Sequence, residues 1–200
     1  MQIAIVKYNA GNIRSVSNAL ERIGCRDVHI TDDIAALQSA DKVIFPGVGE
    51  ASTTMKHLRS TGLDKVILGL KQPVLGICLG MQLMCNHSEE GDVDCLGIFP
   101  VNVRRFILPT PNPDNLKIPQ MGWNTINNLK QPLFSPELEG KFVYFVHSYY
   151  AELCEYTASI THHTLDYSSS LHKDNFYATQ FHPEKSGSVG ETILRNFIAL

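Results

Sequence analysis

The stretch PVLGICLGMQL, residues 73–83, contains the strongest fold signal in this sequence. Its first half, VLGI (74–77), is a short apolar run typical of a buried strand, and residues 79–86 follow with the pattern of a helix. Cys78 lies at the junction, with a glycine two positions away on each side. The stretch therefore predicts a strand, a tight turn and a helix, with a thiol at the corner.

The residues before this stretch repeat the same alternation. Strand patterns fall at residues 2–6, 27–30 and 42–45, and helical patterns at residues 12–24, 34–39 and 51–60. Short apolar strands that alternate with helices imply βαβ units and a parallel sheet covered on both faces.

The alternation of strand and helix patterns ends after Gly97, where strand patterns follow one another with few helices between them. These patterns fall at residues 101–106, 122–126, 141–150, 158–164, 168–172 and 175–182. We expect this half to extend the same sheet in antiparallel fashion, with a hairpin turning at Asp174–Asn175. A closing helix is expected to begin with a capping box formed by Ser188 and Glu191. Residues 1–200 contain no repeat or composition break, so we expect a single domain.

Composition excludes several kinds of partner. The net charge is −3 and no block of like charge occurs, which argues against nucleic acid or an anionic membrane as the main partner. The N-terminus lacks a signal-peptide pattern, and no apolar run approaches the ~20 residues of a membrane span. The 5 cysteines are irregularly spaced, which favours reduced thiols in the cytoplasm over a disulfide framework. No Cys or His cluster has metal-ligand spacing, so no metal and no cofactor are expected.

Cys78 has the surroundings of a nucleophile. A tight strand-to-helix turn holds such a residue in a strained conformation, and the helix N-terminus favours the thiolate. The backbone N–H of Leu79 points into the same site as one donor for an oxyanion. The alternative is that Cys78 is a small buried residue, as most cysteines are. The flanking glycines favour the nucleophile.

A thiolate nucleophile needs a base, and among the 8 histidines the sequence favours His182. It ends the strand pattern NFYATQF and precedes Pro183, which favours an extended backbone at His182. Glu184, two residues on, should then project to the same side and accept a hydrogen bond from the imidazole. A strand-end ion pair without function is the alternative.

A second oxyanion donor is expected from the loop Pro46-Gly47-Val48-Gly49. This loop follows another parallel strand at the same edge of the sheet, where sites in such folds lie. Its glycines allow the backbone conformations that a donor requires, although an ordinary turn would have the same residues.

Together these motifs resemble the class I (triad) glutamine amidotransferases. LGICLGMQL, QFHPEKSG and FPGVG carry the likeness over the whole chain. YNAGN (8–12), MGWN (121–124), FVHSYY (145–150) and KDNFYATQFHPEKSG (173–187) are similar to the family of glutaminase subunits of imidazole glycerol phosphate synthase. The family pattern has histidine where this chain has Gln120.

The resemblance implies a flavodoxin-like, doubly wound α/β fold and a glutaminase that hydrolyses L-glutamine to glutamate and ammonia. Cys78, His182 and Glu184 would be the triad, with a glutamyl thioester on Cys78. The oxyanion would be held by Leu79 and the Gly47–Gly49 loop. The remaining residues implied to bind glutamine are Gly49, Gln82, His147, Ser148 and Tyr149.

The resemblance also implies a partner, because a free glutaminase would waste glutamine. This partner is a (β/α)8-barrel cyclase subunit of the HisF type, which receives ammonia through an internal channel and forms imidazole glycerol phosphate and AICAR in histidine biosynthesis. Residues at matching interface positions are Asn12, Met121, Trp123, Tyr144 and Lys185, although Trp123 could also be a core residue. The isolated chain is expected to be nearly inactive until the partner reorganises the Gly47–Gly49 loop.

Three alternatives remain open at this point. The chain could be a paralogous subunit that supplies ammonia to another synthase, such as one that makes amidino sugars for surface polysaccharides. It could be a free-standing cysteine hydrolase of related fold. It could also be a non-catalytic scaffold or regulatory subunit.

Overall fold

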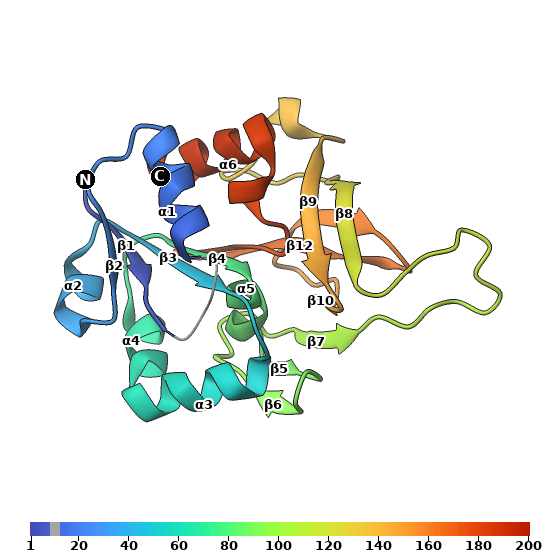
Figure 1. Cartoon of the computed structure of the whole chain (residues 1–200), viewed down its shortest axis with the longest axis horizontal. Coiled ribbons are helices and arrows are strands. Elements are labelled where there is room, and N and C mark those ends of the chain that lie inside the picture. Colours follow the sequence, from blue (N-terminus) through green and yellow to red (C-terminus); the bar gives the residue numbers. More distant parts are fainter. Residues whose placement is uncertain (9–12) are drawn as a thin grey trace.

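The computed structural model describes residues 1–8 and 13–200, so the expected interface residue Asn12 lies outside the described residues. Its main sheet is mixed (Figure 1). The strands in spatial order are β2 (Val28–Thr31), β1 (Ile3–Val6), β3 (Lys42–Gly47), β4 (Val74–Cys78), β13 (Phe176–Thr179), β12 (Asp166–Lys173), β10 (Tyr149–Ala151), β7 (Asn102–Arg105), β5 (His87–Ser88) and β6 (Val93–Asp94), and β11 (Thr157–His162) pairs with β12 off this path. The strands from β2 to β13 are parallel, and the pairs from β13 to β7 are antiparallel.

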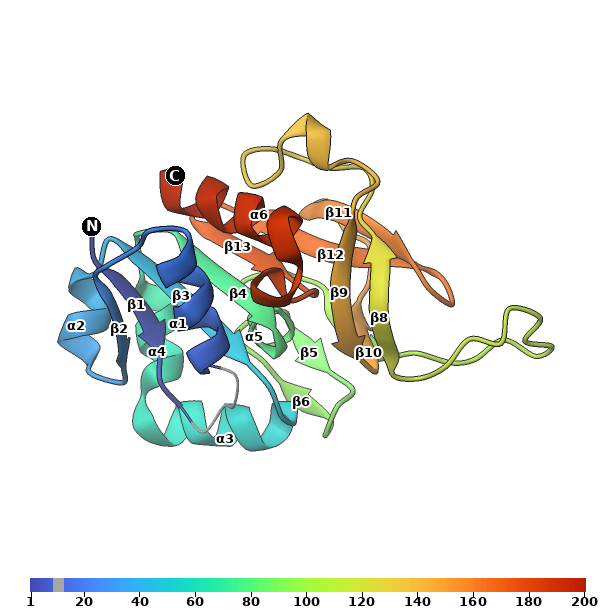
Figure 2. The same cartoon turned by 45° about the horizontal axis from the view of Figure 1, so that its top comes forward.

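Helices cover both faces of the parallel part (Figures 1 and 2). The helices are α1 (Ile13–Arg22) and α6 (Gly187–Ala199) on one face, and α2 (Ile34–Ser39), α3 (Ala51–Thr61), α4 (Leu63–Gly69) and α5 (Leu79–Met84) on the other. Successive strand side chains point to opposite faces, so in β1 Ile3 and Ile5 pack with α1 and α6, whereas Ala4 and Val6 pack with α3 and α5. The predicted doubly wound α/β fold with an antiparallel extension is confirmed.

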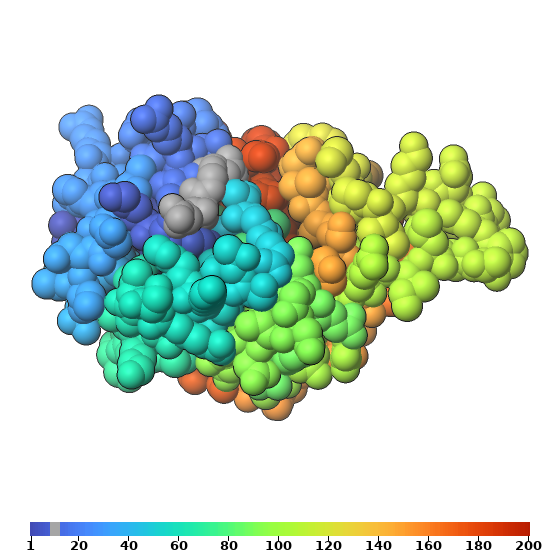
Figure 3. Space-filling view, turned by 60° about the horizontal axis from the view of Figure 1, so that its bottom comes forward, coloured from blue at the N-terminus to red at the C-terminus, as the bar shows by residue number. Residues whose placement is uncertain are grey.

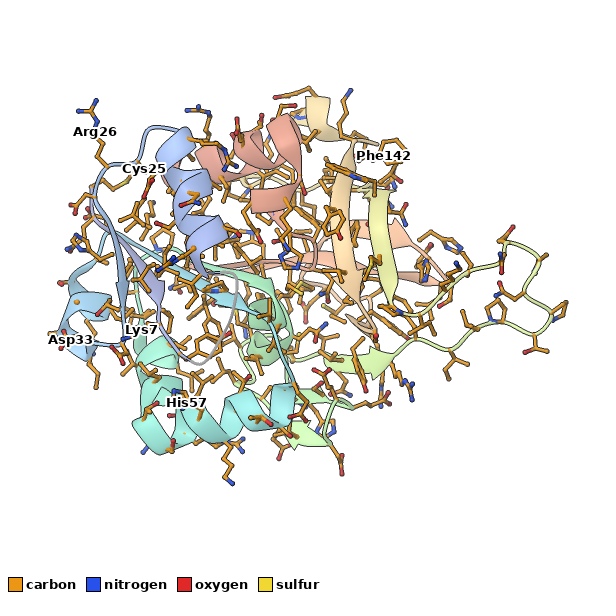
Figure 4. The ribbon with its side chains drawn as sticks, in the orientation of Figure 1. Lys7, Cys25, Arg26, Asp33, His57 and Phe142 are labelled. Carbon is orange, nitrogen blue, oxygen red and sulfur yellow. The ribbon has the colours of Figure 1, made fainter. Side chains whose placement is uncertain are left out.

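One part of the second half does not extend the main sheet. β8 (Gln120–Thr125) and β9 (Phe142–His147) pair with each other as a separate antiparallel sheet, so our expectation was wrong for these two strands. The reason is packing, because Val143 and Phe145 are buried in the cluster that α1 and α6 form with the main sheet. The two strands therefore lie on a face of the sheet and not at its edge. Phe142, at the start of β9, is 57% exposed (Figure 4).

The local predictions near the helices needed three corrections. Helix α4 was not predicted, and the helix after Cys78 ends at Met84 because the chain then enters β5. Helix α6 begins at Gly187, so Ser188 lies inside its first turn and the expected capping box is wrong. Glu191 instead accepts from Arg22 of α1 at 3.3 Å. The hairpin turn at Asp174–Asn175 is confirmed, since Lys173 pairs with Phe176.

Two short 3-10 helices complete the elements, η1 (Pro136–Leu138) and η2 (Pro183–Lys185). Between β7 and β8 the chain extends away from the body of the protein (Figure 3), and Ile107 at its base is 80% exposed. Among residues 1–8 and 13–200, no helix has both the length and the apolar character that crossing a bilayer requires.

The sheet topology fixes where a site can form. From β1 the chain passes to β2 on one side and then back to β3 and β4 on the other, so the order of the strands reverses at β1. Ligands in open α/β sheets bind beyond the carboxyl ends of the strands near such a reversal. Here the carboxyl ends of β3, β4 and β13 are neighbours because these strands are adjacent and parallel.

Candidate active site

Cys78 occupies a strained corner between β4 and α5. Its φ of 54° and ψ of −109° lie where L-residues are rarely found and glycine is usual. The glycines on either side are needed for packing. A Cβ on Gly80 would lie 1.9 Å from the carbonyl oxygen of Phe45, and one on Gly76 would lie 2.8 Å from the sulfur of Met84. A side chain at position 80 would push α5 away from β3, whereas one at position 76 would displace the Met84 side chain and crowd the Gly80 backbone.

His182 and Glu184 form a buried pair close to this corner. His182 Nδ1 and Glu184 Oε1 are 2.7 Å apart, and the two residues are 1% and 7% exposed. Burial alone lowers the pKa of His182, but attraction to a negative Cys78 and to Glu184 outweighs it and raises the pKa to about 10. The imidazole is therefore held as a cation, with Cys78 as the largest attractive influence.

The segment that carries His182 is fixed to β9 by backbone and hydroxyl contacts. The His182 N–H donates to the Tyr144 carbonyl at 2.9 Å. Ser186 Oγ accepts from the Tyr144 N–H at 3.0 Å and donates to the His182 carbonyl at 2.6 Å. These contacts explain why the serine before α6 does not cap the helix, because its hydroxyl holds the turn that positions the imidazole.

A cavity of about 310 Å³ opens at this edge of the sheet, a volume suited to a small molecule. It is lined by Val48, Gly49, Cys78, Leu79, Gln82, Glu90, Pro119, Val146, His147, Ser148, Tyr149 and His182. Glu184 lies behind His182, outside this lining. The strand-end geometry thus brings together residues separated by more than a hundred positions in the sequence.

The loop expected to supply an oxyanion donor borders the cavity only in part. Val48 and Gly49 line it, but Gly47 is the last residue of β3 and pairs with Cys78 in the sheet. A Cβ on Gly47 would lie 2.6 Å from the hydroxyl oxygen of Tyr8, which donates to the Pro46 carbonyl. Gly47 is therefore not among the residues that line the cavity, and its lack of a side chain serves close packing.

His147 lines the cavity, but its imidazole nitrogens are turned toward the protein. Nδ1 donates to the Tyr149 carbonyl at 2.7 Å, and Nε2 lies 3.3 Å from the Tyr167 hydroxyl. Burial lowers the pKa of His147 to about 3, so the ring is neutral at physiological pH. His147 therefore holds the backbone of the Ser148–Tyr149 loop in place.

Gln82 also uses its side-chain amide within the protein. Its Nε2 donates to the Tyr149 carbonyl at 3.0 Å and to Gln180 Oε1 at 2.9 Å. Both hydrogens of this nitrogen are then engaged. The atom that Gln82 can offer to a ligand is its Oε1, which accepts hydrogen bonds.

Two residues of the site were missed from the sequence. Glu90 places a half-buried carboxylate at the cavity, where burial raises its pKa, and it accepts from the Ala51 N–H at 3.1 Å. It lies in a turn after the unpredicted β5, so no pattern pointed to it. Gln180 has its Nε2 3.8 Å from the Cys78 sulfur. Its spacing of two from His182 in an extended segment was a signal that could have found it.

The expected interface residues that the structure describes lie on β8, β9 and η2, and all but the half-buried Tyr144 are exposed. Met121 and Trp123 are 66% and 56% exposed, so Trp123 is not a core residue. Trp123 meets Tyr144 edge to face at 6.1 Å between ring centroids, and Lys185 Nζ lies 5.9 Å from the Tyr144 ring. Tyr144 thus links this patch, through its backbone, to the segment that carries His182.

Comparison with known proteins adds three findings. The family model of glutamine amidotransferase class-I matches residues 5–200. The chain is 62% identical to the imidazole glycerol phosphate synthase subunit HisH of Bacteroides thetaiotaomicron over 100% of both chains, and 42% identical to the subunit of the same name from Shewanella loihica over 98% of this chain and 89% of that one. Its fold is similar to that of a putative GMP synthase protein from Thermoplasma acidophilum, with a TM-score of 0.75 at 23% identity, covering 100% of this chain and 93% of that one.

Proposed function

Because the chain belongs to the class-I glutamine amidotransferases, and within them to the family of imidazole glycerol phosphate synthase subunits HisH, we propose that Cys78, His182 and Glu184 are its catalytic triad. Membership of the family makes the chain a glutaminase, which releases ammonia from L-glutamine. The observation that carries the proposal is the buried His182–Glu184 pair at the cavity that contains the strained Cys78.

The first half of the reaction forms a thioester. The Cys78 sulfur attacks the side-chain amide carbon of glutamine, so an S–C bond forms and the carbonyl electron pair moves onto oxygen. The donors that we assign to this oxyanion are the Leu79 N–H at the start of α5 and a backbone N–H of Val48 or Gly49, because these residues line the cavity. His182 then gives its Nε2 proton to the amide nitrogen, the C–N bond breaks and ammonia leaves.

The second half hydrolyses the thioester. Neutral His182 takes a proton from water, and the resulting hydroxide attacks the acyl carbon. The C–S bond breaks, the sulfur leaves as a thiolate, and glutamate is released. Glu184 holds the imidazole by its bond to Nδ1, so that Nε2 faces the reacting atoms.

Other residues that line the cavity support binding of the amino-acid group of glutamine. The Glu90 carboxylate and the free Gln82 Oε1 are acceptors, so they suit the three hydrogens of the substrate's ammonium group. The backbone of Ser148 and Tyr149 lines the same cavity and is the candidate for the carboxylate. His147 contributes by holding this loop, since its own nitrogens face inward.

We further propose that the ammonia passes to a (β/α)8-barrel cyclase subunit of the HisF type, for imidazole glycerol phosphate formation in histidine biosynthesis. The relatives that support this are subunits by name, and they match this chain over its whole length. The exposed Met121 and Trp123, with the half-buried Tyr144, form the surface on which this partner would dock. The 5 free cysteines fit a reducing compartment, and we propose the cytoplasm.

A labelling experiment tests the triad. A diazo-ketone analogue of glutamine should modify Cys78 covalently, as mass spectrometry of the peptide would show, and Cys78→Ala should abolish the modification. Glutaminase turnover, measured as glutamate formation, should be low for the isolated chain and rise when the cyclase and its ligand are added. Labelling at a cysteine other than Cys78 would overturn the assignment. High turnover that the cyclase leaves unchanged would contradict the proposed dependence on the partner.

The paralogous alternative is tested by the identity of the partner. The barrel protein that co-purifies with this chain should complement a histidine-requiring strain together with it. Complementation of amidino-sugar formation in its place would assign the chain to the other pathway and leave the triad unaffected.

A further inference from the structure

A buried amide that does not line the substrate cavity contacts the nucleophile. Gln180 is completely buried and does not line the cavity, yet its Nε2 lies 3.8 Å from the Cys78 sulfur. Its position follows from strand pairing. β13 runs parallel to β4 with Thr179 opposite Ile77, so the next residue on each strand, Gln180 and Cys78, come side by side. The reaction steps above give Gln180 no role.

The orientation of this amide is fixed by a chain of hydrogen bonds that starts at a backbone carbonyl. The oxygen and nitrogen of a side-chain amide are usually assigned from their neighbours. The Tyr149 carbonyl can only accept, so the Gln82 atom 3.0 Å from it must be the nitrogen. The same nitrogen lies 2.9 Å from Gln180, so the Gln180 atom facing it must be the oxygen. The nitrogen of Gln180, a donor, therefore faces the sulfur.

The chain of hydrogen bonds is itself anchored in the core. The Tyr149 carbonyl also accepts from Nδ1 of His147, whose ring is neutral and buried. Tyr149 is half-buried, and the other members of the chain of hydrogen bonds, His147, Gln82 and Gln180, are at most 6% exposed. Rotation of the Gln180 amide would place its nitrogen against the nitrogen of Gln82 and is therefore disfavoured.

A donor against the sulfur distinguishes the two states of Cys78. The neutral thiol can donate to the Val146 carbonyl, which lies 4.0 Å from the sulfur. The thiolate can only accept, and a hydrogen bond to the charged form favours that form. His182, the other group acting on the sulfur, must give up its proton during the reaction, whereas the Gln180 amide keeps its hydrogens at every step.

We propose that Gln180 is a catalytic residue that donates a hydrogen bond to the Cys78 thiolate, favouring the anion and holding the sulfur in the direction of attack. This inference rests on the proposed role of Cys78 as the nucleophile. When the S–C bond forms, the sulfur loses its negative charge and the hydrogen bond weakens. When the thioester is hydrolysed, the sulfur leaves as an anion and Gln180 stabilises it again.

Two variants change the group that faces the sulfur. Gln180→Glu keeps an oxygen to accept from Gln82 and places a second oxygen against the sulfur. Gln180→Met keeps the length of the side chain and removes both polar atoms. The matched control is Thr179→Val, because the Thr179 hydroxyl is also fully buried but donates to the Phe181 carbonyl, away from the sulfur.

The measurement is the rate of alkylation of Cys78 by iodoacetamide against pH, followed on the Cys78 peptide by mass spectrometry. Gln180→Met should move the midpoint of this profile upward by about one pH unit, because the thiolate loses one hydrogen-bond donor. Gln180→Glu should move it further, and Thr179→Val should match the wild type. The limiting rate at high pH should change little, since a less stabilised thiolate is slightly more nucleophilic.

The complex with the cyclase provides the second readout. Both Gln180 variants should lower kcat for glutamine hydrolysis about tenfold to a hundredfold, while KM changes less than about threefold because Gln180 does not touch the substrate. A midpoint unchanged in both variants would overturn the inference, even if kcat fell through altered packing. Failure of the proposed function has a different signature, because wild-type Cys78 would then not react with the diazo-ketone.

Discussion

Replacing His147 by asparagine should make the protein less sensitive to acid. The imidazole is buried and neutral, with Nδ1 donating to the Tyr149 carbonyl. Asparagine retains a donor at nearly the same place and cannot be protonated. His147→Asn therefore removes the titration while retaining the contact that holds the loop.

The size of the effect follows from the two pKa values of His147. Burial lowers the pKa from 6.5 to about 3 in the folded state. Between these values the unfolded chain binds a proton that the folded chain does not, so stability falls as the pH is lowered through 6.5. From pH 7.5 to pH 5 this single group costs about 2 kcal/mol of unfolding free energy in the wild type and nothing in the variant.

The assay is urea unfolding at both pH values, and the quantity compared is the loss of unfolding free energy between them. The variant will be less stable at pH 7.5 because it leaves a small cavity and loses the contact with Tyr167. Its loss on acidification should nevertheless be smaller by about 2 kcal/mol. His57→Asn on α3 (Figure 4) serves as the control and should lose as much as the wild type. Equal losses in His147→Asn and wild type would refute the reasoning.

Three further predictions concern packing, substrate and partner. Gly80→Ala should lower the unfolding free energy by about 3 kcal/mol or more, because its methyl carbon would lie 1.9 Å from the Phe45 carbonyl oxygen. A melting temperature near that of the wild type would contradict this prediction. Glu90→Gln should raise KM for glutamine by about tenfold or more with a smaller change in kcat, since a charge-assisted hydrogen bond to the ammonium group is lost, and steady-state kinetics would measure it. Trp123→Ala should weaken binding of the cyclase by about 2 kcal/mol, measured by calorimetry. The melting temperature of the isolated chain should not change, because the ring is 56% exposed.

The parallel part of the fold could be predicted because its signals are local. Strands β1, β3 and β4 each contain a short apolar run, and each strand from β1 to β4 is followed by a helical pattern, so the alternation could be read from the sequence. The cysteine corner was equally local, since the requirement for glycine at Gly76 and Gly80 arises from backbone contacts within one strand-turn-helix unit and its neighbour. Pairing of His182 with Glu184 followed from their spacing.

The rest of the fold and of the site could not be predicted from the sequence, because it depends on contacts between segments that are distant in the chain. Strand patterns in residues 120–147 do not tell whether the strands join a sheet edge or lie on its face, because that choice depends on the burial of Val143 and Phe145 against α6. The capping box failed for a similar reason, because Ser186 is engaged by Tyr144, forty-two residues earlier. The positions of Glu90 at the cavity and of Gln180 beside Cys78 likewise arise only when the ends of different strands meet.

The strained corner at Cys78 has a consequence for the evolution of this chain. Its backbone angles suit glycine, so every folded molecule holds the thiol at a conformational cost of about 1–3 kcal/mol. A glycine at this position would relieve the strain and give a more robust fold with no chemistry. Selection for stability alone would therefore remove the cysteine, and selection for the proposed nucleophile would keep it. In a lineage that no longer needs the ammonia, position 78 should be among the first to drift.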